Sequence, residues 1–208
     1  MSIKESQVLE QFLVNLSEEL NKFINDLSLT TLAAARDIIL EAEAQGGRVH
    51  VTGIGKPGHV ADYVASLLSS TGTPAYFLDA TETIHGSAGQ VRPGDVVISI
   101  SNSGETEELK QTVTTLKKNG AQIISVTGGK ESWLSKQSDC TLLASVDHEG
   151  DPLNKPPRAS IIVEVTVLQA LSVLLQEGKG LTAREYVKWH PGGALGQAAA
   201  KQMEGSDQ

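Results

Sequence analysis

Short β-prone runs alternate with longer amphipathic stretches along most of this 208-residue chain, and this alternation constrains the fold more than any other feature. The run DVVISI at 95–100 is the most apolar of them, as a strand buried on both faces would be. Strands that are separated by helices pair in parallel, because each crossover returns the chain to the same end of the sheet. We therefore predict an α/β fold, a three-layer α/β/α sandwich with a five-stranded parallel sheet. The predicted strands lie at 48–52, 75–78, 95–100, 122–127 and 141–144.

Helical periodicity fills the segments before, between and after these strands. A glycine pair, Gly46-Gly47, ends the first helical region. The length fits one ordinary domain over 1–208, with N-terminal helices at 1–46 and an α/β core with C-terminal helices at 47–204. The predicted helices are two within 5–45 and one each at 58–70, 105–119 and 159–176, and a loop rich in proline and charge lies at 147–157.

Composition excludes several classes of protein. Apolar residues make up 39% and charged residues 20%, which is typical of soluble globular chains and argues against disorder. The net charge is -8 and no Lys/Arg cluster offsets it, so we expect no nucleic-acid partner. We see neither the apolar core of a signal peptide nor an apolar run near the roughly 20 residues of a membrane span, so we expect no membrane association. A cytoplasmic location follows, and the single Cys140 fits a reducing compartment.

The motif SNSGET at 101–106 follows the most apolar strand and opens a predicted helix. Open α/β sheets bind ligands at the carboxyl ends of their strands, and the unpaired N–H groups of a helix amino terminus attract anions. Three hydroxyl groups, those of Ser101, Ser103 and Thr106, add hydrogen-bond donors without a buried positive charge. We predict that this loop binds a phosphate group. The alternative is that Ser103 or Thr106 only caps the helix.

A second motif, GIGKPGH at 53–59, also follows a predicted strand directly, so we expect it to lie beside the 101–106 loop. It is neither a Walker loop nor a dinucleotide fingerprint, so it implies no nucleotide cofactor. Lys56 is either a ligand of phosphate or of a sugar oxygen, or a solvated lysine. No spacing of His, Cys and Asp indicates a dedicated metal site.

With these motifs, the chain resembles the sugar isomerase (SIS) domain family, and within it the arabinose 5-phosphate isomerases. The similarity runs from about Val49 to Gly196, nearly the whole domain. The motif HPGGALG at 190–196 best distinguishes the arabinose 5-phosphate isomerases from other SIS domains. The phosphate loop is less specific, because it occurs in many SIS domains, including those that only sense a ligand. The motifs are GIGKPGH at 53–59, SSTGTPAYF at 69–77, ETIHG at 82–86, SNSGET at 101–106 and HPGGALG at 190–196.

The resemblance implies a flavodoxin-like SIS fold and an enzyme that isomerises a phosphorylated sugar between aldose and ketose forms without a cofactor. It also implies a homotetramer in which His85 or His190 acts across a subunit interface. By position, it suggests Lys56, Glu105, Glu149 and His190 as catalytic residues and Gly55, His85, Ser101, Asn102, Ser103 and Thr106 as substrate-binding residues.

Isomerisation through a cis-enediol needs a base, a group that handles the proton of the second oxygen, and positive stabilisation. We expect His190 to open the ring or shuttle the oxygen proton and Lys56 to stabilise negative charge. Glu105 and Glu149 remain alternative bases, and each has a simpler interpretation. Glu105 fits the acidic first turn of a helix, and Glu149 fits a solvated loop charge.

Two positions depart from the pattern of the family, which usually has Ser where this chain has Pro57. Proline offers neither a hydroxyl nor a backbone N–H to a phosphate. The loop after Glu149 has Arg158 in place of hydroxyl residues, and its guanidinium is a possible anion ligand. Arabinose 5-phosphate isomerases usually carry a pair of CBS modules after the SIS domain, and this sequence ends shortly after HPGGALG. Two alternatives to arabinose 5-phosphate isomerase stay open, a non-catalytic sugar-phosphate sensor and an isomerase of a different ketose phosphate.

Overall fold

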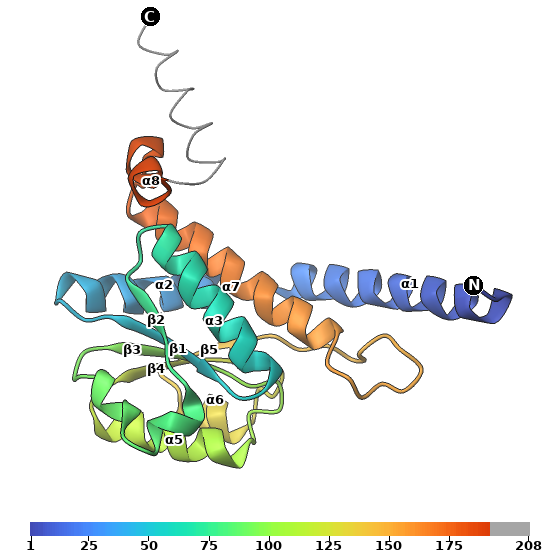
Figure 1. The fold of residues 1–208 in the computed structure, drawn as a ribbon, viewed down its shortest axis with the longest axis horizontal. Coiled ribbons are helices and arrows are strands. Elements are labelled where there is room, and N and C mark those ends of the chain that lie inside the picture. Colours follow the sequence, from blue (N-terminus) through green and yellow to red (C-terminus); the bar gives the residue numbers. More distant parts are fainter. Residues whose placement is uncertain (192–208) are drawn as a thin grey trace, which may run out of the picture.

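The sheet of the computed structural model, which describes residues 1–191, contains five strands that all run parallel (Figure 1). This confirms the predicted fold class. The strand order is β2-β1-β3-β4-β5, so the chain moves outward from β1 to β2 and then crosses back to β3. The strands are β1 Val49–Gly53, β2 Ala75–Phe77, β3 Val96–Ile100, β4 Gln122–Thr127 and β5 Cys140–Leu143.

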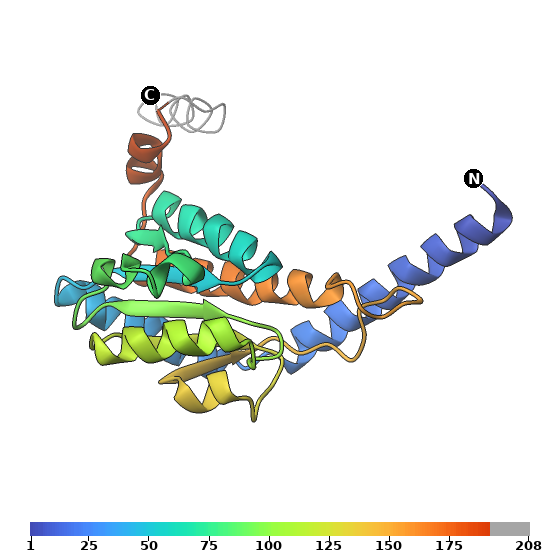
Figure 2. The same ribbon diagram turned by 60° about the horizontal axis from the view of Figure 1, so that its bottom comes forward.

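Helices cover both faces of the sheet, and Figure 2 shows the three layers edge-on. One face carries the long helices α2 Leu29–Ala44, α3 Lys56–Ser70 and α7 Ala159–Gly178. The opposite face carries α4 Ala80–Thr83, the 3-10 helix η1 Ser87–Gln90, α5 Glu107–Lys118 and α6 Trp133–Gln137.

Successive side chains of the central strands point to opposite faces and therefore enter two separate cores. Ile98 packs with the core under α2, α3 and α7, whereas its neighbour Val97 packs with the core under α5. Both side chains are fully buried, as the apolar sequence of this strand predicts.

The core helix α7 has the length and hydropathy of a membrane-crossing helix, with a mean hydropathy of 1.8 over 18 residues. The expectation that no apolar run reaches this length was therefore wrong. Half of that stretch is buried inside the fold against the sheet and its neighbouring helices, which is how the central helix of an α/β sandwich hides its apolar surface.

The first helix, α1 Ile3–Asp26, begins with a capping box between Ser2 and Glu5 and extends away from the rest of the molecule (Figures 1 and 2). Its carboxyl-terminal part packs on the body, where Glu19 and Phe23 are buried. The last described helix, α8 Ala183–Trp189, follows α7 at the other end of the molecule (Figure 1).

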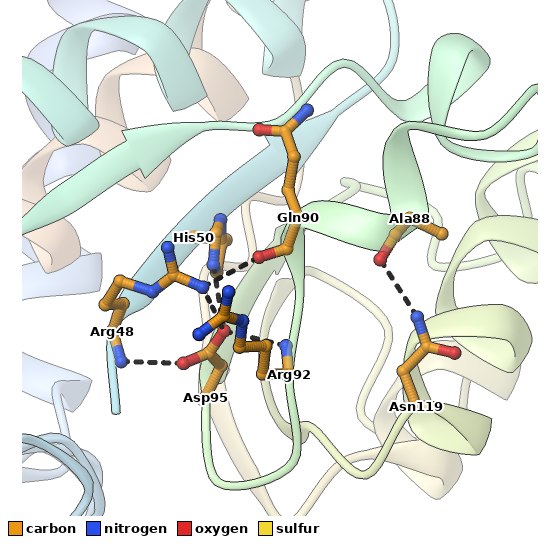
Figure 3. Close-up of polar contacts among 7 residues, drawn as sticks. All are labelled: Arg48, His50, Ala88, Gln90, Arg92, Asp95 and Asn119. Carbon is orange, nitrogen blue, oxygen red and sulfur yellow. Dashed lines mark hydrogen bonds and ion pairs between the residues drawn. The ribbon is translucent and has the colours of Figure 1, made fainter. Parts of the chain in front are cut away.

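A buried polar network joins β1 to β3 at the amino edge of the sheet (Figure 3). The Asp95 carboxylate accepts hydrogen bonds from the backbone N–H groups of Arg48 and Arg92, both at 2.9 Å. Its Oδ2 also lies 3.2 Å from His50 Nε2 and 3.3 Å from the Arg48 guanidinium. Because Arg48 precedes β1, His50 lies within it and Asp95 precedes β3, these contacts hold the two central strands in register.

Candidate active site

The two central strands, β1 and β3, end side by side, with Gly53 paired to Ile100. After β1 the chain enters α3 on one face, and after β3 it enters α5 on the other. Such a topological switch point leaves a crevice at the carboxyl ends of the strands, where open α/β sheets bind ligands. The expectation that the 53–59 and 101–106 loops lie next to each other is confirmed.

A cavity of about 290 Å³ occupies this crevice. Loop 101–106 forms one wall, and the 149–164 segment, which includes the start of α7, forms the other. Its polar lining residues are Ser101, Asn102, Ser103, Thr106, Glu149, Lys155, Ser160 and Glu164.

The phosphate-loop candidates adopt a tight turn at the start of α5. The Ser101 Oγ accepts the Gly104 N–H at 3.1 Å and lies 3.3 Å from the Thr106 hydroxyl. Gly104 has a φ of 66°, and a Cβ there would lie 2.3 Å from the Ser132 Oγ, so the turn requires glycine. Thr106 is the N-cap residue of α5, but its side chain makes no capping hydrogen bond. Ser103 does stabilise the turn locally, because its Oγ accepts the Glu105 N–H at 3.2 Å.

Glu149 is buried against the amino terminus of α7. Its Oε2 accepts the N–H groups of Arg158 at 2.6 Å and Ser160 at 3.1 Å, so the carboxylate caps this helix. No donor within residues 1–191 contacts Oε1 of Glu149. The alternative that Glu149 is a solvated charge in a loop is therefore wrong.

The loop that carries Glu149 is anchored on α1. Glu19, which is buried, accepts the Asp147 N–H at 2.9 Å through Oε2, and its Oε1 lies 3.2 Å from His148 Nε2. The Asn15 side chain donates to the Gly150 carbonyl at 2.9 Å. These contacts bridge more than 120 positions of sequence, and the sequence contains no local sign of them.

Glu105 has different surroundings, because both of its carboxylate oxygens are occupied. Oε1 accepts the Trp133 N–H at 2.7 Å, and Oε2 pairs with the Lys110 ammonium at 2.9 Å. The hydrogen bond from Trp133, together with that from Lys110, lowers the pKa of Glu105. Glu105 is exposed and does not line the cavity, so within this chain it ties α5 to the start of α6.

Lys56 begins α3 after Gly55, which has a φ of 66°, and both residues are exposed. Lys56 lines a neighbouring hollow of about 330 Å³ that shares Pro157 and Ile161 with the crevice. Pro57 lines the crevice itself and offers no N–H there, as its sequence predicts.

Arg158 points away from the crevice. Its Nε donates to Asp151 at 2.8 Å, and its guanidinium lies over the ring of Phe12 on α1, 5.8 Å from the centroid. The hypothesis that this guanidinium replaces a phosphate ligand is therefore not supported by its position.

The two candidate histidines, His85 and His190, lie outside the crevice of their own chain. His85 is an exposed residue between α4 and η1. His190 ends α8, where its Nδ1 lies 2.8 Å from the Tyr186 carbonyl oxygen and its ring stacks on Tyr186. The preceding Trp189 contacts the turn before β2, because a Cβ on Gly72 would lie 2.8 Å from its indole. That turn is at the amino edge of the sheet, whereas the crevice is at the carboxyl edge. The rest of the HPGGALG motif, 192–196, lies outside the described residues.

Two cavity residues on α7, Ser160 and Glu164, were not singled out from the sequence. They are one helical turn apart, and Glu164 places a charged residue type in the interior of a strongly apolar helix, which is the signal that would have found it. Both are fully buried, and neither the Ser160 Oγ nor the Glu164 carboxylate oxygens have a hydrogen-bond partner among the residues described. Burial, together with the charge of Glu149, raises the pKa of Glu164 to about 8.

Comparison with known proteins gives a consistent result. The sequence profile of the SIS domain matches residues 44–174. The arabinose 5-phosphate isomerase KdsD of Pseudomonas aeruginosa is 42% identical over 158 residues, which cover 76% of this chain and 48% of that protein. The probable arabinose 5-phosphate isomerase of Haemophilus influenzae is 36% identical over 193 residues, which cover 93% of this chain and 53% of that protein. This chain thus spans about half the length of these curated relatives.

Among solved structures, the c3406 protein of Escherichia coli CFT073 in complex with arabinose 5-phosphate superposes with a TM-score of 0.84 and 34% identity. The match covers 92% of this chain and 100% of that one. Together with the profile match over residues 44–174, these similarities establish the family of the chain. The chain belongs to the SIS domain family.

Proposed function

We propose that this chain is an aldose–ketose isomerase that interconverts arabinose 5-phosphate and ribulose 5-phosphate. The observation that carries the proposal is the buried carboxylate of Glu149, which faces the SNSGET loop across one cavity at the switch point of the sheet. The relatives named above supply the substrate pair, since they are arabinose 5-phosphate isomerases or hold that sugar phosphate.

In the proposed complex the 101–106 loop binds the phosphate. The hydroxyl groups of Ser101, Ser103 and Thr106 donate to its oxygens, together with the first N–H groups of α5. The side chain of Asn102, which also lines the cavity, and the backbone at Gly55, which stands between the lining residues Ile54 and Pro57, complete the proposed binding site. This mode of binding suits an acidic chain because helix N–H groups and hydroxyls attract an anion without a cluster of cations.

Glu149 is the base of the proposed reaction. Its Oε1, which accepts from no donor among residues 1–191, takes the proton from carbon 2 of the open-chain aldose while the carbonyl oxygen at carbon 1 gains a proton, which gives the cis-enediol. Return of a proton to carbon 1, with loss of the proton from the oxygen at carbon 2, gives the ketose. Glu105 is the weaker candidate, because its two oxygens are engaged and its pKa is lowered by Trp133 and Lys110.

The remaining residues act at the edges of this site. Lys56 stabilises the negative charge that develops on the sugar oxygens, from a position beside the crevice. We propose that His190, with His85, reaches the crevice of another subunit of a homotetramer, since neither lines the crevice of its own chain. In that arrangement His190 opens the sugar ring or carries the oxygen proton.

Incubation with arabinose 5-phosphate in deuterated water tests the proposal. We expect ribulose 5-phosphate to form and deuterium to appear at the exchanging carbon. Ketohexose and heptose phosphates, run in parallel, would identify a different substrate of the same reaction. Tight binding of a sugar phosphate with no exchange at any carbon would instead identify a sensor and exclude the isomerase.

A further inference from the structure

The carboxyl group of Glu164, on α7, is one of the buried polar groups of the described chain that lack a hydrogen-bond partner. Its residue is 0% exposed, and neither oxygen has a hydrogen-bond partner within residues 1–191. Ser160, one turn earlier on α7, is also fully buried with an unpartnered hydroxyl. Buried polar groups in proteins are nearly always hydrogen-bonded, because an unpaired one loses its hydration without compensation.

Both residues lie on the wall of the crevice, opposite the 101–106 loop and next to Glu149. The cavity, rather than the apolar core behind α7, is therefore the space in which a ligand can supply the missing hydrogen-bond partners. A ligand that fills the cavity with hydroxyl groups would satisfy both side chains. A phosphorylated sugar is a ligand of this kind, since each of its hydroxyls both donates and accepts.

The charge state of Glu164 fits a hydroxyl partner. Burial and the charge of the neighbouring Glu149 together raise the pKa of Glu164 to about 8, so Glu164 carries a proton at neutral pH. The other charged groups near the cavity are Lys155 on its wall and Lys56 in the adjoining hollow. A protonated carboxyl donates one hydrogen bond and accepts another, whereas an ionised one only accepts.

We propose that Glu164 is a substrate-binding residue whose neutral carboxyl group, together with the Ser160 hydroxyl, hydrogen-bonds the sugar hydroxyls of the phosphorylated substrate. This inference rests on the proposed function, because it takes the same crevice and the same class of ligand. It separates the two cavity carboxyl groups by role. Glu149, held by the N–H groups of α7, is the base, and Glu164 selects the ligand by its hydroxyl groups.

The substitution Glu164→Leu distinguishes this role from a structural one. Leucine is of similar size and removes an unpaired polar group from a buried site, so the free protein should melt about 2–4 °C higher than wild type. The same substitution should raise KM for arabinose 5-phosphate on the order of tenfold to a hundredfold, because it leaves substrate hydroxyls unpaired. Glu164→Gln keeps one donor and one acceptor and should raise KM less than Glu164→Leu does.

Ser172→Ala is the matched control, because Ser172 is a buried polar residue two turns further along α7 that pairs with Thr71 and does not line the cavity. It should leave KM unchanged. Melting curves and steady-state kinetics on the full chain, with calorimetric titration of arabinose 5-phosphate, give all the readouts.

Three results would overturn the assignment of Glu164. The first is an active wild type together with a Glu164→Leu variant whose KM and dissociation constant for arabinose 5-phosphate are unchanged. That result would reject the role of Glu164 and leave the proposed function intact. Another is a melting temperature of Glu164→Leu below that of the wild type, which would mean that the carboxyl has a partner inside the protein. The third is a Glu164→Gln variant with normal binding and abolished kcat, which would make Glu164 a proton carrier. A wild-type chain that neither binds nor converts any sugar phosphate would refute the proposed function itself, and with it this inference.

Discussion

The two glutamates that compete for the role of base have opposite surroundings. Glu149 is buried on the cavity wall, and its Oε1 has no donor in the described part of the chain. Glu105 is exposed and uses both oxygens in contacts with Trp133 and Lys110. A general base needs a free lone pair within reach of the substrate, so the difference in hydrogen bonding, rather than residue type, separates the two.

We therefore expect Glu149→Gln to lower kcat by about a hundredfold to ten-thousandfold, because glutamine keeps the shape and loses the base. Glu105→Gln should lower kcat much less and should lower the melting temperature, since it weakens the ion pair with Lys110. Steady-state kinetics and thermal melts of both variants make the comparison. A larger loss of kcat in Glu105→Gln than in Glu149→Gln would reverse the two roles.

At the scale of elements, α1 supports the site from a distance. Glu19 and Asn15 on this helix bind the backbone of the loop that carries Glu149. The amino-terminal half of α1 leaves Val8, Leu9 and Leu13 exposed, although its Phe12 lies against Arg158.

Glu19→Ala should lower kcat on the order of tenfold, because the Asp147 N–H loses its acceptor and the loop no longer holds Glu149 in place. The adjacent Glu18→Ala is the control, since Glu18 is exposed on the same helix. Kinetics with arabinose 5-phosphate and melting curves of the two variants test this. Equal kcat values for them would show that α1 does not position the loop.

The buried polar network at the amino edge of the sheet should make the stability of the fold depend on pH. Asp95 is buried, which by itself raises its pKa, but the N–H groups of Arg92 and Arg48 and the His50 ring outweigh burial and lower it. Burial lowers the pKa of His50, against the opposing effect of Asp95. Both groups bind protons more readily in the unfolded chain, so acid destabilises the fold. The loss begins as the pH falls below the ordinary histidine value near 6.5, and the contribution of Asp95 declines as the pH falls below about 4 toward the lowered pKa of its folded state.

Asp95→Asn should lower the free energy of unfolding by about 1–3 kcal/mol at pH 7, because it removes the charged acceptor shared by Arg48, His50 and Arg92. This deficit should shrink as the pH falls below about 4, because the unfolded wild-type chain then binds a proton at Asp95 that the folded chain binds only at lower pH. Urea unfolding at pH 7, 5 and 3.5 measures it, with exposed Asp62→Asn as the control. A deficit that does not depend on pH would mean that the carboxylate charge contributes nothing.

The longer elements agree with their predicted positions, and the short ones were not predicted. Helices α4, η1, α6 and α8 have 4, 4, 5 and 7 residues, too few for a helical period to emerge from the sequence. The predicted helix at 105–119 begins instead at Glu107, because Thr106 adopts an extended N-cap conformation. The helix predicted from residue 58 begins at Lys56, since proline fits the first turn of a helix.

At the scale of the whole molecule, the proposed catalytic groups lie at two ends of one chain. Glu149 is at the carboxyl edge of the sheet, and His190 follows Trp189, which contacts Gly72 at the amino edge. One chain therefore does not bring the two side chains together, so the proposed cooperation needs His190 from a second subunit.

This arrangement predicts complementation between inactive variants. Glu149→Gln and His190→Ala should each be inactive alone, and their mixture, after subunit exchange, should recover turnover well above either parent. A hybrid oligomer contains sites with an intact Glu149 from one subunit and an intact His190 from another. The mixture is assayed beside each parent and beside a mixture of wild type with the double variant. No recovery after demonstrated exchange would place both residues in one subunit or remove His190 from catalysis.

The sequence by itself determined the secondary structure and the placement of the loops, which depend on residues close together in the chain. Periodicity, glycine turns and the position of SNSGET after an apolar strand predicted the parallel sheet and the crevice, because strand and helix formation and loop placement follow from local pattern and topology. The tertiary structure decided which side chains meet. It engaged Glu105 with Trp133 and Lys110, turned Arg158 toward Asp151, and placed Glu164 in the cavity wall. These outcomes depend on burial and hydrogen bonding between distant segments, which local sequence does not encode.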